Sequence, residues 1–375
     1  MAGLNVAFQR LDRLYEEFRE EFLGLFDGLM KKGNFILGQE VREFEREFAA
    51  YCGTTHCIGL ASGLDALTLS LNALDLKQGD EVIVPANTYI ATWIAVSRSG
   101  LKPVPVEPEE EGFQMDSNKI REHITDRTKV IMPVHLYYQM PDMDAISELA
   151  RDYSLRVVAD SAQAHGATYK GRKAGSTAEI EAFSFFPTKN LGAIGDGGAV
   201  VTGDNEVAER LRMLRNYGTR EKYISEIIGY NSRLDEVQAA FLRFKLKALN
   251  QWNAKRRSIA KKYLNELDVE TLQLPKVKDY ANPNWHIFPI MCDFRDELSR
   301  GLERNGVQSI VHYPVPPYSQ GAYSSLGLSE RRFPISTRIA RNILSIPMHP
   351  YMTEEETDYV IEMVNDLSRE HRKLS

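Results

Sequence analysis

The chain has 375 residues, of which 43% are hydrophobic and 26% are charged, proportions that are ordinary for a globular protein with more than one domain. Its net charge of -6 gives no electrostatic reason to bind nucleic acid or an anionic membrane. The three cysteines, Cys52, Cys57 and Cys292, fit neither a disulfide framework nor a zinc site. Because no apolar run suits a signal peptide or a bilayer span, we expect a cytoplasmic protein without a metal.

The N-terminal part of the chain predicts helix and then an alternation of strands and helices. Residues 1–35 carry apolar side chains at helical spacing. The strands predicted after them are 81–84, 103–106, 129–134, 155–159, 182–186 and 199–202, and the helices are 63–74, 142–153, 205–216 and 235–252. This alternation predicts an α/β domain with a mostly parallel sheet that is covered on both faces.

The helical pattern continues from 235 to 267 and predicts a connection to a smaller C-terminal α+β domain. That part contains a predicted strand at 286–292, a helix after Asp293 and a final helix from Thr353. We therefore expect an N-terminal arm and large domain over 1–250 and a small domain over 251–375.

Two polar residues follow predicted strands at the ends where ligands bind in open α/β sheets. Asp160 ends the strand 155–159, and Lys189 lies in a turn after 182–186. A lysine that forms a Schiff base with the cofactor aldehyde, and a carboxylate that pairs with the pyridinium nitrogen, are the two fixed points of a pyridoxal phosphate site. An N-cap role for Asp160 and a surface position for Lys189 are the alternatives.

Further residues suit the same cofactor. Ser62, Gly63 and Leu64 open a predicted helix whose N–H groups could bind the phosphate, although Ser62 could equally be an ordinary N-cap. Ser184 could add a hydroxyl to the phosphate, and Gln163 could bind the ring hydroxyl.

Aromatic and imidazole side chains complete the predicted pocket. Tyr89 could stack on the pyridine ring, or pack as a surface aromatic. His135, His312 and Tyr313 could line a substrate pocket, although a lone histidine is more often structural.

With these residues in place, the chain resembles the DegT/DnrJ/EryC1/StrS sugar aminotransferases, which have the type I pyridoxal phosphate fold of aspartate aminotransferase. The most specific segments are 160–166 (DSAQAHG), 183–198 and 229–235 (GYNSRLD), and the resemblance runs from about residue 35 to the C-terminal helix. It implies that Lys189 is the Schiff-base lysine and that Asp160 is the pyridinium partner. It also implies that Asn231 reaches the cofactor phosphate of a neighbouring subunit, and hence a homodimer with shared active sites.

Within that family, runs such as 214–218 and 311–314 look most like enzymes that aminate C-3 of a dTDP-linked 3-oxo-6-deoxyhexose. The resemblance implies transfer from L-glutamate through a pyridoxamine phosphate form, to a Fuc3N- or Qui3N-type sugar of the kind used in lipopolysaccharide O-antigen. Lys222, Tyr223 and Arg233 are candidates for the nucleotide sugar. The alternatives are C-4 amination of a UDP- or GDP-linked keto-sugar, amination of a scyllo-inosose ring, and a catalytically silent cofactor-binding regulator.

The chain departs from that pattern at a few positions. Phe186 stands where those enzymes usually have tyrosine, and Thr188 replaces a usual glycine. Tyr138 and Tyr318 stand where glycine and histidine are common, and residues 62–64 replace an Asn-Gly-Thr type of turn. We expect Phe186 and Tyr318 to affect sugar recognition and to leave the cofactor residues unchanged.

Overall fold

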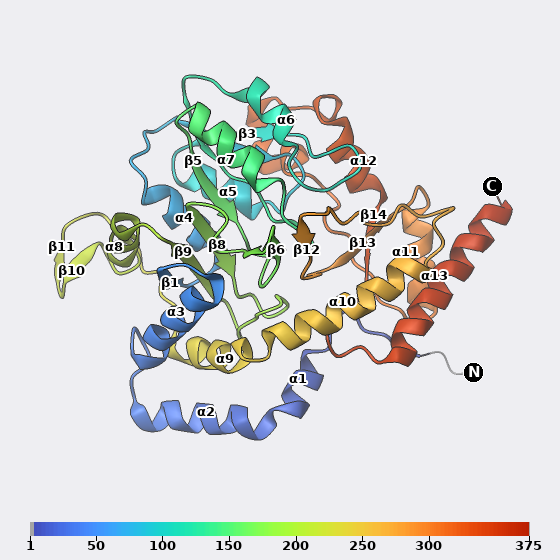
Figure 1. Ribbon diagram of the computed structural model, residues 1–375, viewed down its shortest axis with the longest axis horizontal. Coiled ribbons are helices and arrows are strands. Elements are labelled where there is room, and N and C mark those ends of the chain that lie inside the picture. The colour runs from blue at the N-terminus through green and yellow to red at the C-terminus, as the bar shows by residue number, and fades with distance from the viewer. Residues whose placement is uncertain (1–3, 375) are drawn as a thin grey trace.

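The computed structural model describes residues 4–374 and has a seven-stranded sheet at its centre (Figure 1). The strand order is β1-β9-β8-β5-β4-β2-β3, and all neighbours are parallel except those of β9. The central strands are β1 His56–Leu60, β2 Glu81–Pro85, β3 Lys102–Val106, β4 Thr128–Ile131, β5 Arg156–Asp160, β8 Ile180–Ser184 and β9 Gly198–Thr202. The mostly parallel sheet that the sequence predicts is therefore confirmed.

Helices cover both faces of this sheet because alternate strand residues point to opposite sides. Val82 and Val84 of β2 pack with α4 Gly63–Asn72, α5 Ala91–Arg98 and α8 Asn205–Leu214. Ile83, between them, packs with α3 Gln39–Cys52, α7 Met143–Asp152 and α9 Glu236–Leu246. Short elements complete this part of the chain: α6 Ser117–Ile120, β6 Thr168–Tyr169, β7 Arg172–Lys173, β10 Thr219–Glu221 and β11 Ile224–Ser225.

The C-terminal part has its own core around a two-stranded antiparallel sheet, β13 Phe288–Met291 and β14 Ile343–Ile346. Helix α10 Leu249–Glu266 leads into it from the large sheet (Figure 1). The remaining elements are β12 Ala281–Asn282, α11 Arg295–Arg304, α12 Pro334–Asn342 and α13 Glu354–Leu374. Val6 and Phe8 also belong to this core, so the arm near the N-terminus packs against the C-terminal part. The domain division at residue 250 stays a prediction.

Two predicted helices are interrupted. The prediction of helix over 1–35 is wrong for residues 4–10, where Val6 pairs with Val307 as a bridge, and residues 1–3 lie outside the described part. The rest forms α1 Leu11–Glu17 and α2 Arg19–Lys32, which are separated at Phe18. The pattern over 235–267 is likewise two helices, α9 and α10, because the chain bends at Lys247 and Ala248. Within residues 4–374, no helix is long and apolar enough to cross a membrane.

Candidate active site

A cleft of about 490 Å³ lies where β1, β2, β5 and β8 end, all four running in the same direction, beside the C-terminal part. The carboxyl edge of an α/β sheet is where ligands bind in this architecture. Most of the predicted site residues line this cleft: Ser62, Gly63, Leu64, Tyr89, Asp160, Gln163, Ser184, Lys189, His312 and Tyr313. Segments that follow β1, β2, β4, β5 and β8 thus converge with two segments of the C-terminal part, at His286 and at 312–313.

Lys189 lies in the turn after β8, half-buried at the wall of the cleft. The turn is closed by its backbone N–H, which donates to the Phe186 carbonyl at 2.8 Å. Burial lowers the pKa of the Lys189 amine from 10.5 to about 8, although the nearby Asp160 carboxylate acts in the opposite direction. A substantial fraction of the amine is therefore neutral near physiological pH, and the neutral form is the nucleophile.

Asp160 ends β5 and is only 6% exposed. Its Oδ2 accepts a hydrogen bond from Thr92 Oγ1 at 2.8 Å, and its Oδ1 accepts from the Ala162 N–H at 3.1 Å. Burial raises the pKa of this carboxyl, whereas the two hydrogen bonds and the nearby Lys189 lower it. The effect of burial is larger, so the pKa lies above its usual value. A buried carboxylate with this balance is suited to a cationic partner in the cleft, such as a protonated ring nitrogen.

The start of α4 and the end of β8 approach each other very closely. A Cβ built on Gly63 would lie 2.6 Å from the Ser184 Cβ, so only glycine fits there. Ser62 caps the helix, and its side chain accepts from the Asp65 N–H at 3.1 Å. The cap role that the sequence left open is thus present, and the first N–H groups of α4 lie beside the Ser184 hydroxyl at the cleft. This combination suits a phosphate group.

A fixed pair of polar side chains joins the two parts of the molecule across the cleft. Gln163 Oε1 accepts from the Tyr137 N–H at 2.5 Å, which orients the amide so that Nε2 donates to the Tyr313 hydroxyl at 3.0 Å. The Tyr313 ring lies 5.2 Å from the ring of Tyr89, which is 54% exposed and leaves an aromatic face open to the cleft. These residues together fit pyridoxal phosphate: an amine, a carboxylate, a phosphate cradle and an aromatic wall in one cleft.

His135 does not reach the cleft. Its neighbours Val134 and Leu136 line it, but the His135 side chain points into the protein interior, where Nε2 lies 3.5 Å from Glu181 Oε2. Both side chains are almost fully buried. The prediction that His135 contacts the substrate is therefore corrected, because adjacent residues of an extended segment face opposite sides.

Asn231, Lys222, Tyr223 and Arg233 also lie outside the cleft of this chain. The hairpin β10–β11, which carries Lys222 and Tyr223, projects beyond α8 at the end of the molecule opposite the C-terminal part (Figure 1). Tyr223 is 88% exposed, and Asn231, in the segment that follows the hairpin, is also exposed. Arg233 is held within its own segment, since Nη1 donates to Asn216 Oδ1 at 3.1 Å. One chain alone therefore does not bring these four residues to its own site.

The positions at which the sequence departs from its resemblance separate into two groups. Phe186 and Thr188 line the cleft, and Phe186 is half exposed there. Tyr138 is instead a core residue that stacks on Trp285 at 4.7 Å between ring centroids. Tyr318 is also buried, with its ring 4.6 Å from Phe333 and its hydroxyl hydrogen-bonded to Thr337. The expectation that Tyr318 affects sugar recognition is not supported by its position, whereas that for Phe186 remains.

Two polar residues that support the site, Thr92 behind the cleft and His286 in its wall, were missed from sequence. Thr92, which holds Asp160, also lies 3.0 Å from Thr88 Oγ1, and their spacing of four just after a strand was the available signal. His286 lines the cleft, and its Nδ1 donates to Asn190 Oδ1 at 3.1 Å. Burial holds the pKa of His286 well below its usual range, so the ring is neutral. No local pattern marked His286, because it reaches the cleft from the edge of the C-terminal part.

Comparison with known proteins agrees with this geometry. Residues 16–365 match the DegT/DnrJ/EryC1/StrS aminotransferase family. The chain belongs to this family. The predicted family, the type I fold and the class of enzyme are therefore confirmed, and solved structures of this fold carry the pyridoxal and pyridoxamine forms of the predicted cofactor.

Several relatives in this aminotransferase family are similar along their whole length. The chain is 47% identical to the dTDP-3-amino-3,4,6-trideoxy-alpha-D-glucose transaminase of Streptomyces venezuelae, covering 96% of each. It is 46% identical to the dTDP-3-amino-3,6-dideoxy-alpha-D-galactopyranose transaminase of Aneurinibacillus thermoaerophilus, over 96% of this chain and 99% of that one. The crystal structure of DesV from S. venezuelae in complex with a ketimine intermediate superposes with a TM-score of 0.96, at 46% identity, over 97% of this chain and 98% of that one.

Proposed function

We propose that this aminotransferase uses pyridoxal phosphate to move an amino group from L-glutamate to C-3 of a dTDP-linked 3-oxo-6-deoxyhexose. The observation that carries the proposal is the meeting of Lys189 and Asp160 in a cleft that also holds a phosphate cradle. The relatives of nearly half identity that are named for dTDP-3-amino sugars support the choice of substrate. We place the reaction in the cytoplasm, in the synthesis of deoxyamino sugars such as those of O-antigen.

Each side chain of the cleft is assigned to the part of the cofactor that it would contact. When bound, the cofactor supplies an aldehyde that carries the amino group and a ring that withdraws electrons from the reacting carbon. Asp160 would hold the ring nitrogen, and the Gly63 backbone with Ser62, Leu64 and Ser184 would hold the phosphate. Tyr89 would cover one face of the ring, and Gln163 would bind its hydroxyl.

Lys189 would both anchor the cofactor and move the proton. An amine with a pKa of about 8 can accept and return a proton near neutral pH, which is what a general acid–base at the reacting carbon needs. Burial lowers the pKa of His312 to about 4, so this ring is neutral and binds substrate by hydrogen bonding rather than by charge. We assign His312 and Tyr313, with Phe186, to the wall that receives the sugar.

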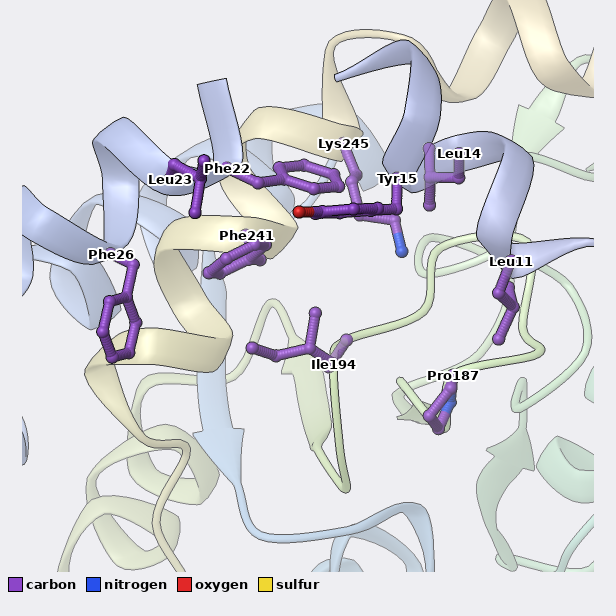
Figure 2. A pocket seen from close by; sticks show the side chains of 11 residues that line it. Leu11, Leu14, Tyr15, Phe22, Leu23, Phe26, Pro187, Ile194, Phe241 and Lys245 are labelled. Atoms are coloured by element: carbon purple, nitrogen blue, oxygen red, sulfur yellow. The ribbon is translucent and has the colours of Figure 1, made fainter. Parts of the chain in front are cut away.

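We also propose a homodimer in which Asn231, and the substrate candidates Lys222, Tyr223 and Arg233, serve the partner's site. The exposure of Asn231, Lys222 and Tyr223 in a single chain supports this arrangement. A second observation is a cavity of about 370 Å³ between the N-terminal helices and α9, which is lined mainly by apolar side chains (Figure 2). Tyr15, Leu23, Phe26 and Ile194 around it are each between 45% and 52% exposed. Exposed apolar groups that gather in this way are typical of an interface.

The test is product analysis. The holoenzyme is incubated with L-glutamate and a panel of dTDP-, UDP- and GDP-linked keto-sugars, and the position of the new amino group is read by NMR. Amination at C-3 of the dTDP sugar supports the proposal, and amination only at C-4 of another nucleotide sugar refutes it. A bound cofactor that glutamate fails to convert to the pyridoxamine form would indicate a silent regulator. Lys189→Ala must lose both the cofactor linkage and turnover.

A further inference from the structure

His286 is a buried side chain in the wall of the cleft that has no part in the reaction as proposed above. It lies just before β13, where the C-terminal part meets the cleft, and it is 7% exposed. Lys189 lines the same cleft. Burial lowers the pKa of His286, and among the charged groups Lys189 lowers it most. The two side chains are therefore near enough to interact.

The hydrogen bond between His286 and Asn190 fixes which ring nitrogen carries the proton. Asn190 Nδ2 donates to the backbone carbonyl of Asn284 at 2.9 Å and to Asn253 Oδ1 at 2.8 Å. A backbone carbonyl can only accept, so the amide nitrogen must face it and the amide oxygen must face the imidazole. His286 Nδ1, which lies 3.1 Å from that oxygen, therefore donates. Because the ring is neutral, its Nε2 carries no proton and can only accept.

The Nε2 of His286 is an unused acceptor that is open to the cleft. It forms no hydrogen bond within residues 4–374, and protein atoms do not enclose it. The other ring nitrogen is held by Asn190, the residue that follows Lys189 in the chain. The Lys189 amine in turn has no hydrogen-bond acceptor among the described residues. An unused acceptor and an unused donor thus line one cleft.

Two other neutral histidines near Lys189 are less suited to accept from it. Burial lowers the pKa of His165 to about 3 and that of His312 to about 4, and the charge of Lys189 acts in the same direction. His165 is fully buried against two phenylalanine rings and does not line the cleft. His312 lines it, but its Nδ1 lies 2.9 Å from a serine hydroxyl that can donate or accept, so its tautomer is not fixed. Of the three, His286 alone presents a fixed lone pair to the cleft.

We propose that His286 is a positioning residue for Lys189: its Nε2 accepts a hydrogen bond from the Lys189 amine when that amine is free and protonated. This inference rests on the proposed function, in which Lys189 takes a proton from the amino donor and later returns it. As the carbon–hydrogen bond of the donor breaks, its proton becomes the third hydrogen of the Lys189 ammonium. The hydrogen bond to Nε2 then holds the ammonium in place until the proton is returned. The proton stays on Lys189, because the pKa of the imidazole is much lower than that of the amine.

The direct test is a crystal structure of the wild-type holoenzyme after L-glutamate has converted the cofactor to its pyridoxamine form, which leaves Lys189 free. Crystals at pH 7 keep the amine protonated. Lys189 Nζ should lie within about 3.2 Å of His286 Nε2. A structure in which Nζ lies beyond hydrogen-bond reach of Nε2, or in which Nε2 binds only water or a substrate hydroxyl, would overturn the inference.

A kinetic test uses two variants that keep different halves of the imidazole. In His286→Asn the amide can replace Nδ1 as the donor to Asn190, but no atom takes the place of Nε2. In His286→Gln the amide oxygen can reach the place of Nε2. Misplacement of a reacting group by about 1 Å costs about 100-fold in rate. The maximal rate of cofactor conversion by L-glutamate, followed by stopped-flow absorbance, should therefore fall roughly 10- to 100-fold in His286→Asn, and His286→Gln should keep most of it.

The control is His123→Asn, because His123 precedes β4 and so lies at the opposite edge of the sheet from the cleft. With glutamate deuterated at its α-carbon, the isotope effect on the rate should be larger in His286→Asn than in the wild type, since proton transfer becomes slower. An unchanged isotope effect, or equal loss of rate in both His286 variants, would refute the inference. A wild type whose cofactor glutamate does not convert would refute the proposed function instead. The wild-type crystal structure decides if His286→Asn does not fold.

Discussion

The lowered pKa of Lys189 can be tested through the rate at which apoenzyme captures added pyridoxal phosphate. Only the neutral amine attacks the aldehyde, so the rate should rise about tenfold per pH unit and level off near pH 8. At pH 7 a group with a pKa of about 8 is roughly one-tenth neutral, whereas one at 10.5 is neutral in roughly three molecules in ten thousand. The structure thus predicts capture about 300-fold faster than by an ordinary lysine.

The same experiment separates the two effects that set this pKa. Burial lowers it and the Asp160 carboxylate raises it, so Asp160→Asn should move the midpoint of the rate profile to lower pH. Lys189→Ala should show no capture, and Lys77→Ala, at an exposed position, should leave the profile unchanged. The assay is stopped-flow absorbance of covalent attachment between pH 6 and 10.5. A wild-type rate that keeps rising beyond pH 10, or an Asp160→Asn midpoint above that of the wild type, would refute the reasoning.

Two further outcomes follow from the same site, and a third follows from the buried pair of Glu181 and His135. Gly63→Ala places a Cβ 2.6 Å from Ser184 Cβ, and such overpacking costs about 1–3 kcal/mol. Cofactor binding, measured by fluorescence titration, should therefore weaken about 5- to 150-fold. Gly24→Ala, which has open space around it, should leave cofactor binding unchanged. Thr92→Val removes the hydrogen bond to Asp160 Oδ2, so cofactor retention should fall by about 1.5–3 kcal/mol, roughly 10- to 150-fold; equal retention in dialysis would argue against this role. Burial alone would raise the pKa of Glu181, but hydrogen bonds and the adjacent His135 lower it to about 2. The ionised Glu181 therefore stabilises the folded state by about 3 kcal/mol above pH 4.5, and this contribution is lost as the pH falls toward 2. In Glu181→Gln, the free energy of unfolding should fall less steeply with decreasing pH, as followed by circular dichroism.

The sheet could be predicted from sequence because its strands alternate with amphipathic helices along the chain. Asp160 and Lys189 could be found because each directly follows such a strand, and strand ends meet at one edge of the sheet. Sequence patterns do not predict the position of a residue that is placed by contacts with residues distant in the chain. His286 reaches the cleft through packing of the C-terminal part, and the pairing of Val6 with Val307 replaces helix in the arm although the two residues are 301 positions apart.

The sequence also did not predict the direction in which each side chain points. That direction decides which departures from the family pattern can affect substrate specificity. Sequence order placed His135, Tyr138, Phe186 and Tyr318 equally close to the predicted pocket, but only Phe186 lines it. The other three are almost fully buried. Tyr138 and Tyr318 are buried and their hydroxyls are already hydrogen-bonded, so they can affect the substrate only by shifting the residues that line the cleft. Any difference in sugar recognition that arises at these four positions should therefore come from Phe186, whose half-exposed ring adjoins the turn of Lys189 and lacks a hydroxyl.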